Sequence, residues 1–477
     1  MNETSAIADA LATIRAAVGE AGWVDGAARE PYLREWRGLY HGAAAAVVAP
    51  ASTEEVAAVV RACAEARIGI VPQSGNTGLC GGAAPDASGT QVLLSLRRMN
   101  RVREVDPAND TLTVEAGCVL ADIQRTAAEA DRLFPLSLAA EGSCMLGGNL
   151  ATNAGGTNVL RYGNTRDLCL GLEVVLADGR IWNGLTGLRK DNSRYDLKDL
   201  FIGSEGTLGV ITAAVLRLFP RPRQVQTALL ALDSPATAVA LLPELREAGG
   251  DTLTACELMS RASLEMAVHH VPGCRDPLDA PHPWYLLVEL STPQVGDGLR
   301  GALEGALEQA MGNDRVRDGV VAESLEQGRA LWHLRESIPE GQTRDGASIK
   351  HDVSVAVSRL PQFVEEATAR VEAALPGVRV CPFGHVGDGN LHFNLSQPEG
   401  MDPDTFRGHW DAFNRIVHDV VADLGGSIAA EHGVGQLKVA ELERLKDPVE
   451  LELMRSVKRA LDPAGIMNPG KIVKTAD

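Results

Sequence analysis

Residues Pro72–Gly82 have the sequence PQSGNTGLCGG, and this stretch says most about the fold. The apolar residues Ile68–Val71 directly before it predict a short strand that runs into a glycine-rich loop. Backbone amides in such a loop can converge on a pyrophosphate, because a missing Cβ permits positive φ and close approach. No GxGxxG opens a helix and no GxxxxGK[ST] occurs, so ordinary Rossmann and P-loop sites are excluded.

Two further glycine clusters follow, GGNLATNAGG at Gly147–Gly156 and GSEGTLG at Gly203–Gly209. One such cluster alone could be a tight surface loop that binds nothing. Three clusters with polar neighbours favour a site for a phosphate-containing cofactor. In the first loop, the backbone contacts would come from glycines and the side-chain hydrogen bonds from polar residues. These residues are Gly75, Gly78, Gly81 and Gly82, together with Ser74, Asn76 and Thr77.

Composition limits the classes of function. A chain of 477 residues is expected to form two or three domains. The net charge of -18 argues against nucleic acid, which needs a basic surface. The eight cysteines include no CxxC pair, which predicts reduced thiols and excludes iron–sulfur and cysteine–zinc sites. Neither a signal peptide nor a membrane-spanning stretch is visible, so we expect a cytoplasmic protein that is not an integral membrane protein.

The pattern of apolar residues alternates between strands and helices, which favours α/β or α+β architecture. Ser52 and Glu55 form a capping-box pattern for a helix that runs to about Ala66. The prolines in Pro220–Pro222 predict a linker and a domain boundary. Beyond it, we expect a strand over 349–357 and a helix over 405–424.

A candidate metal site lies late in the chain, where His385–Asn394 has the sequence HVGDGNLHFN. We expect His385 on a loop and a strand over 391–395 with His392 and Asn394 on its polar face. Glu431, in the sequence AEHGVG, could supply a carboxylate ligand. Each residue alone is as compatible with an ordinary polar role. Together, two histidines and a glutamate predict a site suited to Zn²⁺ that could also take Mn²⁺, Co²⁺ or Fe²⁺.

These motifs resemble the vanillyl-alcohol-oxidase or PCMH-type FAD-binding fold. Within it they resemble the branch of D-2-hydroxyglutarate dehydrogenases, D-lactate dehydrogenases and the glycolate oxidase FAD subunit, from about Ala46 to Lys471. The resemblance implies an α+β protein in three parts. A two-part PCMH-type FAD-binding domain would span 1–220, and an α+β substrate or cap domain of the FAD-linked oxidase C-terminal type would span 221–425. A short helical segment, 426–477, would return to the flavin site.

The resemblance also implies FAD as the cofactor. The loop at 72–82 would hold its pyrophosphate, and the segments 135–156 and 203–211 would hold the isoalloxazine and the remainder. Covalent relatives carry a histidine where this chain has Thr77, so we expect non-covalent attachment. The family often has Gly-Gly-Gly-Thr-Gly where this chain has Ser74–Gly78. The implied cofactor residues are Pro72, Ser74, Gly75, Asn76, Thr77, Gly78, Gly81, Pro135, Gly142, Gly148, Asn149, Thr152, Asn153, Gly155, Gly156, Glu205, Gly206, Val210, Ile211 and Asn468.

For the chemistry, the resemblance implies that His385, His392 and Glu431 bind a divalent metal, with Zn²⁺ as the expected ion. His432 would be the catalytic base and would also contact the substrate, together with Arg335, Lys350 and Asn394. Asp388 would be structural. Some 2-hydroxyglutarate enzymes have a threonine at the position of Pro339, and this difference leaves the far end of the substrate open.

The predicted function is therefore FAD-dependent, metal-assisted oxidation of a small D-2-hydroxy acid, with D-2-hydroxyglutarate to 2-oxoglutarate preferred. Electrons would pass to an external acceptor, such as an electron-transfer flavoprotein or a quinone, and a homodimer is compatible with the sequence. Alternatives within the fold are a D-lactate or glycolate dehydrogenase and an enzyme of ether-lipid synthesis. Alternatives from other classes are a non-catalytic flavoprotein subunit of a larger oxidase and a flavin-independent metallohydrolase.

Overall fold

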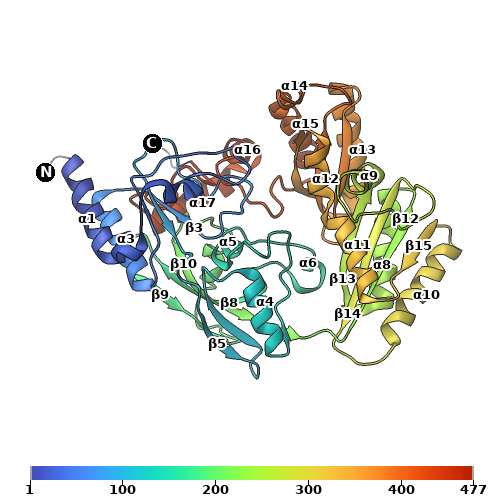
Figure 1. Cartoon of the computed structure of the whole chain (residues 1–477), viewed down its shortest axis with the longest axis horizontal. Helices are drawn as coiled ribbons and strands as arrows, with labels where there is room; N and C mark the ends of the chain where they lie inside the picture. Colours follow the sequence, from blue (N-terminus) through green and yellow to red (C-terminus); the bar gives the residue numbers. More distant parts are fainter. Residues whose placement is uncertain (1–2, 475–477) are drawn as a thin grey trace. The chain divides into compact units, whose positions relative to one another are not determined.

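The computed structural model describes residues 3–474, which divide into two compact units (Figure 1). The first unit contains the chain up to residue 156, residues 163–221 and the chain from 431 onward. The second contains 222–430 and the short segment 157–162, which carries the helix α6 (Val159–Tyr162). The mixed content of helix and strand confirms the predicted α+β class.

A small sheet in the first unit precedes the first glycine-rich loop. Its strands, in order, are β1 (Trp23–Val24), β2 (Ala46–Val48), β4 (Val92–Ser95) and β3 (Ile70–Gln73). The last three are parallel, and the loop begins where β3 ends. Helices α1 (Glu3–Gly22) and α3 (Thr53–Ala66) lie side by side and bury apolar residues against this sheet (Figure 1).

The N-cap predicted for α3 is confirmed at Ser52, and the return bond of Glu55 reaches the residue before the N-cap. The Ser52 hydroxyl accepts a hydrogen bond from the backbone amide of Glu55 at 3.2 Å. The Glu55 carboxylate in turn accepts one from the backbone amide of Ala51 at 2.7 Å. Both contacts satisfy backbone donors at the start of the helix, which fixes where it begins. The helix ends at Ala66, where Arg67 adopts a φ of 53°.

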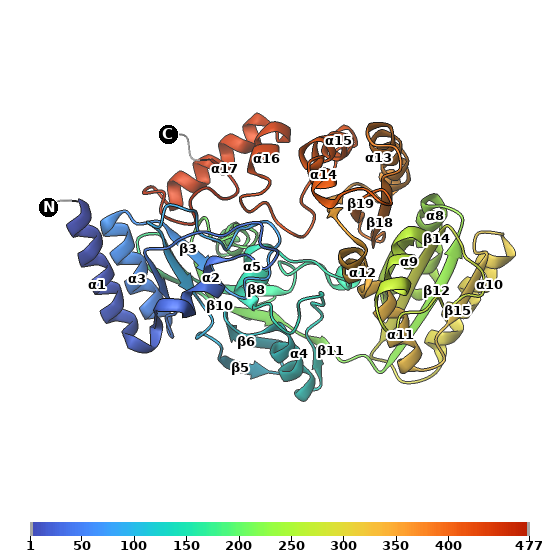
Figure 2. The same ribbon diagram turned by 45° about the horizontal axis from the view of Figure 1, so that its top comes forward.

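A second, antiparallel sheet completes the frame of the first unit. Its strands, in order, are β5 (Val102–Asp106), β6 (Thr111–Glu115), β10 (Val210–Arg217), β8 (Cys169–Val175) and β9 (Ile181–Gly184). The third glycine cluster ends directly before β10. The short helix α5 (Leu146–Ala151) overlaps the start of the second glycine cluster. The short helix α7 (Lys198–Phe201) lies just before the third cluster. Near the C-terminus, α16 (Val439–Leu445) and α17 (Pro448–Leu461) lie next to each other, and Leu442 and Leu451 share an apolar cluster (Figure 2).

The second unit is built on an eight-stranded sheet whose strand pairs are antiparallel. Its strands, in order, are β15 (Asp318–Val321), β12 (Gln224–Leu232), β14 (Trp284–Thr292), β13 (Leu253–Ser260), β18 (Arg379–His385), β19 (Asn390–Ser396) and β16 (Ser348–Ile349), and β17 (Asp352–Ser354) also pairs with β19.

Helices contribute to the core beside this sheet. Apolar residues of α9 (Arg261–His270), α11 (Leu325–Glu336) and α12 (Ile338–Asp345) form one cluster with residues such as Leu229 and Leu287. The residues that alternate with Leu229 and Leu287 along their strands point to the other face of the sheet. Helices α8 (Pro235–Gly249) and α10 (Gly298–Gly312) also contact the sheet, and α13 (Leu360–Ala374) packs against α8 and α15 (Trp410–Asp423).

Three local predictions in this unit are wrong in detail. His385 is the last residue of β18, not a loop residue, because it pairs with Glu257 on β13. The strand predicted over 349–357 is interrupted after Ile349 and ends at Ser354, although both pieces keep one register on β19. The helix predicted over 405–424 is divided into α14 (Pro403–Arg407) and α15, with Gly408 between them. Glycine is a poor residue for a helix interior.

Candidate active site

The first glycine-rich loop packs closely on the segment before α5. A Cβ added at Gly75 would lie 2.7 Å from the carbonyl oxygen of Ser143, so only glycine fits there. A Cβ added at Gly147 would lie 2.7 Å from the Ser74 hydroxyl. The Asn76 side chain donates to the carbonyls of Pro31 and Arg34, so it anchors the loop to neighbouring chain. The first and second glycine clusters are therefore one packed structure.

The third cluster meets the first loop from another side. A Cβ added at Gly206 would lie 3.0 Å from the Pro72 ring, and one added at Gly82 would lie 2.9 Å from the Glu205 carboxylate. The Asn468 amide donates to the carbonyl of Gly82 at 2.9 Å and to that of Glu205 at 2.7 Å. Four segments that are distant in sequence thus converge in the first unit.

Several predicted cofactor residues have features typical of a binding site. Asn76, Asn153, Glu205 and Asn468 all have positive φ, between 41° and 53°. Such backbone strain concentrates at functional sites. Among the residues that the structure describes, the buried side-chain oxygens of Asn149 and Asn468 have no hydrogen-bond donor. Buried acceptors of this kind normally have a partner, so both can receive a polar ligand.

Other predicted cofactor residues could contact a ligand only through their backbone. Val210 and Ile211 at the start of β10 bury their side chains, 1% and 6% exposed. A Cβ added at Gly156 would lie 2.0 Å from the carbonyl of Ser137, which accounts for the glycine there. Gly78 and Gly142 have open space where a Cβ would stand. Thr152 donates its hydroxyl to the carbonyl of Gly148.

The loop that carries Glu431 and His432 is held by the buried carboxylate of Glu205. That carboxylate accepts hydrogen bonds from the backbone amides of Val434 and Gly435, at 2.7 and 2.8 Å. Burial raises the pKa of Glu205, and the two amide donors oppose that rise. Gly433 and Gly435 have positive φ, and a Cβ at Gly435 would lie 2.0 Å from the Cys80 carbonyl. The nearest carboxylate oxygen of Glu431 is 3.8 Å from Nε2 of His432.

In the second unit, a buried glutamate that the sequence analysis missed connects two predicted site residues. Glu257 on β13 is fully buried, and its Oε1 lies 2.6 Å from Nδ1 of His385. Its Oε2 accepts from Nε and Nη2 of Arg335 at 2.9 and 2.8 Å. Burial alone would raise the pKa of Glu257, but the charges of His385 and Arg335 lower it to about 2. The signal in the sequence was one acidic residue in an otherwise uncharged strand, LTACELMS.

His392 lies close to His385 and opposite a second acidic residue that was not assigned to the site. The two imidazole rings are 5.7 Å apart between centroids, in an edge-on arrangement. Asp352 on β17 pairs with His392 across the sheet, and its carboxylate accepts from the Asn390 amide at 3.0 Å. Two imidazoles with a neighbouring carboxylate are a donor set that suits Zn²⁺ or a similar divalent ion.

The predicted substrate residues of this unit differ in how firmly they are held. Asn394 is 3% exposed; its amide donates to Gln342 at 2.8 Å and accepts from the His351 backbone at 3.3 Å. Lys350 is half-buried in the gap between β16 and β17. Pro339 occupies the first turn of α12, where a proline costs no hydrogen bond.

His385 and His392 belong to the second unit, whereas Glu431 and His432 belong to the first.

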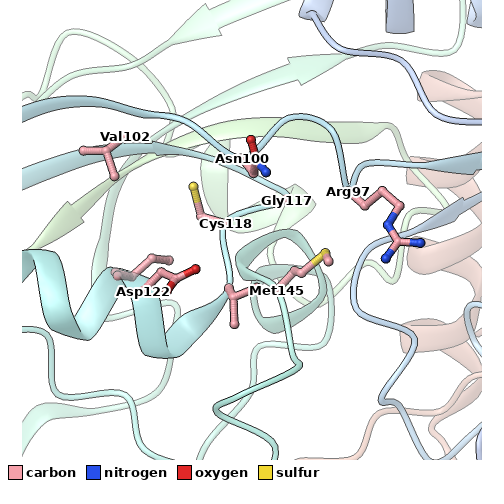
Figure 3. A pocket seen from close by; sticks show the side chains of 9 residues that line it. Arg97, Asn100, Val102, Gly117, Cys118, Asp122 and Met145 are labelled. Atoms are coloured by element: carbon pink, nitrogen blue, oxygen red, sulfur yellow. The ribbon is translucent and has the colours of Figure 1, made fainter. Parts of the chain in front are cut away.

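A separate cavity of about 300 Å³ lies in the first unit between the start of α4 (Leu120–Glu129) and the strand β5 (Figure 3). Cys118, Asp122 and Met145 contribute side chains to it. None of the predicted cofactor residues lines this cavity. Met145 nevertheless directly precedes α5, so the cavity adjoins the packed glycine clusters.

Residues 44–184 match the family model of the FAD binding domain. Residues 221–472, more than half of the chain, match that of FAD linked oxidases, C-terminal domain. The chain belongs to the FAD-linked oxidase family. These two matches, together with the relatives described below, show that the chain is an FAD-dependent dehydrogenase. The buried side-chain oxygens of Asn149 and Asn468 fit a polar cofactor such as FAD.

The relatives of this FAD-linked oxidase cover nearly its whole length. The D-2-hydroxyglutarate dehydrogenase of Xanthomonas citri pv. viticola is 38% identical over 94% of this chain and 93% of that protein. The mitochondrial D-2-hydroxyglutarate dehydrogenase of Bos taurus is 40% identical over 94% of this chain and 80% of its own. The D-2-hydroxyglutarate–pyruvate transhydrogenase of Saccharomyces cerevisiae is 34% identical over 93% of this chain and 89% of that protein.

Solved structures agree on the fold. The structure of p-cresol methylhydroxylase with substrate bound superposes with a TM-score of 0.79 at 18% identity, over 99% of this chain and 98% of that one. Alkyldihydroxyacetonephosphate synthase superposes with a TM-score of 0.72 at 17% identity, over 97% of this chain and 84% of that one. At such identities the likeness concerns the fold alone, and it confirms the predicted PCMH-type architecture.

The prediction of a cytoplasmic location is wrong on this comparison. The relatives from cattle, rat, Arabidopsis thaliana and zebrafish are all named as mitochondrial enzymes. The Xanthomonas relative shows that the family also occurs in bacteria. Within residues 3–474, no helix is long and apolar enough to cross a membrane.

Proposed function

We propose that this FAD-dependent dehydrogenase oxidises D-2-hydroxyglutarate to 2-oxoglutarate with the help of a divalent metal ion. The observation that carries the proposal is the identity of 38 to 40% over 94% of the chain to enzymes with that name. Such coverage leaves about 6% of this chain outside each comparison. The donor set of His385, His392 and the carboxylates gives independent support from the chemistry of the side chains.

We assign the metal to His385, His392 and Glu431, with Zn²⁺ as the expected ion. The two imidazoles come from adjacent strands, which gives them fixed directions. A divalent ion bound there would act as a Lewis acid toward the hydroxyl and carboxylate oxygens of the substrate. Asp352, opposite His392, would add negative charge beside the site.

His432 is the proposed general base. Its imidazole would take the proton of the substrate hydroxyl, and the nearest carboxylate oxygen of Glu431 lies 3.8 Å from its Nε2. FAD, when bound, supplies the two-electron acceptor for the hydride that leaves the Cα atom of the substrate. Oxidation of the alcohol therefore balances: one proton goes to His432, one hydride leaves with the cofactor, and a 2-oxo acid remains.

Arg335 and Lys350 are proposed to orient the anionic substrate. The Arg335 guanidinium is held by Glu257 and lies 4.9 Å from the centroid of the Phe383 ring. Two of its five N–H donors serve Glu257, which leaves donors for a substrate carboxylate. Asn394 would contribute a further polar contact. Because Pro339 cannot offer a hydroxyl, the distal carboxylate of the substrate would depend on other donors.

Electrons would leave the enzyme for an external acceptor. An electron-transfer flavoprotein or a quinone would serve, and the name of the yeast relative points to a 2-oxo acid in that role for that protein. Non-covalent attachment of FAD and a homodimeric state remain predictions.

A substrate screen tests the proposal. The purified protein would be assayed for reduction of an artificial dye with D- and L-2-hydroxyglutarate, D-lactate, D-malate and glycolate. We expect the highest kcat/KM for D-2-hydroxyglutarate and little turnover of the L enantiomer. A higher kcat/KM for D-lactate or glycolate would show that D-2-hydroxyglutarate is not the preferred substrate, although the protein would still be a 2-hydroxy acid dehydrogenase. No turnover of any 2-hydroxy acid by protein that retains FAD would overturn the proposed function.

A further inference from the structure

Glu257 stands at the centre of a buried group of three charged or polar side chains in the second unit. It pairs directly with His385 across β13 and β18, so both side chains lie on one face of the sheet. Arg335 approaches from α11. The exposed fractions are 0% for Glu257, 6% for Arg335 and 7% for His385. Such burial makes the arrangement rigid, because side chains in a packed interior have few alternative rotamers.

Both oxygens of the carboxylate are used, and each has a different partner. Oε1 faces Nδ1 of His385 at 2.6 Å, and Oε2 faces two nitrogens of Arg335. A buried carboxylate is tolerated only when it is paired and hydrogen-bonded in this way. If either partner moves, one oxygen of the buried carboxylate loses its hydrogen bond. The carboxylate therefore couples the positions of the imidazole and the guanidinium.

The contact also decides which nitrogen of His385 can bind a metal. The carboxylate accepts a hydrogen bond from Nδ1–H, so Nε2 is the nitrogen that gives up its proton and offers a lone pair when a metal binds. A histidine ligand needs that lone pair, and metal-binding histidines commonly donate their other N–H to a carboxylate. On the other side, Glu257 fixes the fork of Arg335 that would meet a carboxylate of the substrate.

We propose that Glu257 is a positioning residue that holds the metal ligand His385 and the substrate-binding Arg335 in one arrangement. The inference rests on the proposed function, because it takes the roles of His385 and Arg335 from there. It goes beyond that function by predicting that metal affinity and substrate affinity share one buried determinant. A purely structural ion pair would affect stability but neither affinity.

The chain offers a matched control in Glu289. This carboxylate lies on the neighbouring strand β14, on the same face of the sheet, and also contacts α11. Its Oε2 accepts from the indole nitrogen of Trp332 at 2.6 Å and from the Thr227 hydroxyl at 3.1 Å. None of these partners is a proposed site residue. Glu289→Gln therefore perturbs the same face without touching His385 or Arg335.

The experiment compares the full-length, FAD-loaded wild type with Glu257→Gln and Glu289→Gln. Calorimetric titration of metal-depleted protein with Zn²⁺ alone gives the dissociation constant, and dye reduction at saturating Zn²⁺ gives KM and kcat. A glutamine amide can turn its N–H toward His385 and favour the tautomer protonated at Nε2. We expect Glu257→Gln to weaken Zn²⁺ binding 10- to 100-fold and to raise KM about 10-fold or more. Glu289→Gln should leave both within about 2-fold of wild type.

Glu257→Asp provides a second variant in case the glutamine variant does not fold. It keeps the charge but is one methylene shorter, so it cannot reach both partners, and we expect a smaller loss of both affinities. Unchanged Zn²⁺ affinity and KM in a folded Glu257 variant would overturn the positioning role while leaving the proposed function intact. Wild-type protein that binds no Zn²⁺ and is indifferent to a chelator would instead overturn the metal assignment, and this inference with it.

Discussion

Glu205 accepts a hydrogen bond from the backbone amide of Val434 at 2.7 Å, joining residues that are 229 positions apart in the chain. A second bond from the amide of Gly435 uses the other carboxylate oxygen. Glu205 belongs to the third glycine cluster, and the amides belong to the loop directly after His432. One carboxylate therefore connects the third glycine cluster to the segment that carries the proposed base.

Glu205→Gln should slow the chemical step. A glutamine offers one oxygen acceptor to two amide donors, so the loop after His432 loses a fixed contact. Displacement of a catalytic group by about 1 Å can cost up to 100-fold in rate, and we expect a 10- to 100-fold slower anaerobic reduction of the flavin by D-2-hydroxyglutarate in protein that has been saturated with FAD. Stopped-flow absorbance measures this rate. The exposed Glu129→Gln on α4 serves as control, and an unaltered rate in Glu205→Gln would contradict this role.

Lys458→Met should destabilise the C-terminal segment of the first unit. The ammonium group of Lys458 is buried and donates to the carbonyls of Thr207 and Met467 and to the Asp462 carboxylate, at 2.6 to 2.7 Å. Removing it leaves the buried Asp462 carboxylate with two backbone amide donors but without its charged partner, which costs about 3 to 5 kcal/mol. A clear drop in Tm is expected.

The control for this prediction is Lys446→Met, which removes an exposed ion pair with Glu450. Exposed pairs contribute about 1 kcal/mol or less, so its Tm should change little. Equal Tm values for the two variants would show that the burial of Lys458 does not matter for stability.

Lys471 gives stability a dependence on pH. Burial lowers the pKa of its ammonium group to about 8, although Asp86 and Glu205 oppose this shift. Between pH 8 and about 10.5 the unfolded chain binds more protons than the folded protein, so this residue makes the protein more stable as pH rises through that range. The variant Lys471→Met should not show this contribution to the rise in stability with pH.

Thermal unfolding of the wild type and Lys471→Met at pH 7.5 and pH 10 tests this prediction. The stability of the wild type relative to the variant should increase by about 2 kcal/mol between these values. A constant difference in Tm across the range would mean that Lys471 titrates normally in the folded protein.

The capping of α3 could be predicted from the sequence because it depends on local geometry: Ser52 accepts from an amide three residues later. The glycine clusters could be recognised as motifs, but the contact that requires Gly75 could not, because it is made with the distant carbonyl of Ser143. Glu257 could not be found in this way. Its role depends on the register between β13 and β18, which places residue 257 opposite residue 385. His385 was expected on a loop for the same reason, since its strand partner is distant in sequence.

His432→Asn tests the assignment of the base. The variant keeps a polar side chain but cannot accept the proton of the substrate hydroxyl at neutral pH. General base catalysis contributes on the order of 10²- to 10⁴-fold, so flavin reduction by D-2-hydroxyglutarate should fall by that factor, while the flavin absorbance of the oxidised protein stays unchanged. Reduction at the wild-type rate would exclude His432 as the base.

The most direct test of the central claim is the anaerobic reduction of the bound flavin by D-2-hydroxyglutarate before metal removal, after it and after Zn²⁺ is restored. We expect rapid bleaching of the flavin in the untreated protein, strong slowing after treatment with a chelator, and recovery with Zn²⁺. L-2-Hydroxyglutarate should not bleach the flavin at any stage. Rapid bleaching by D-2-hydroxyglutarate in fully metal-depleted protein would exclude a role for the metal, and no bleaching in the untreated protein would exclude D-2-hydroxyglutarate as the substrate.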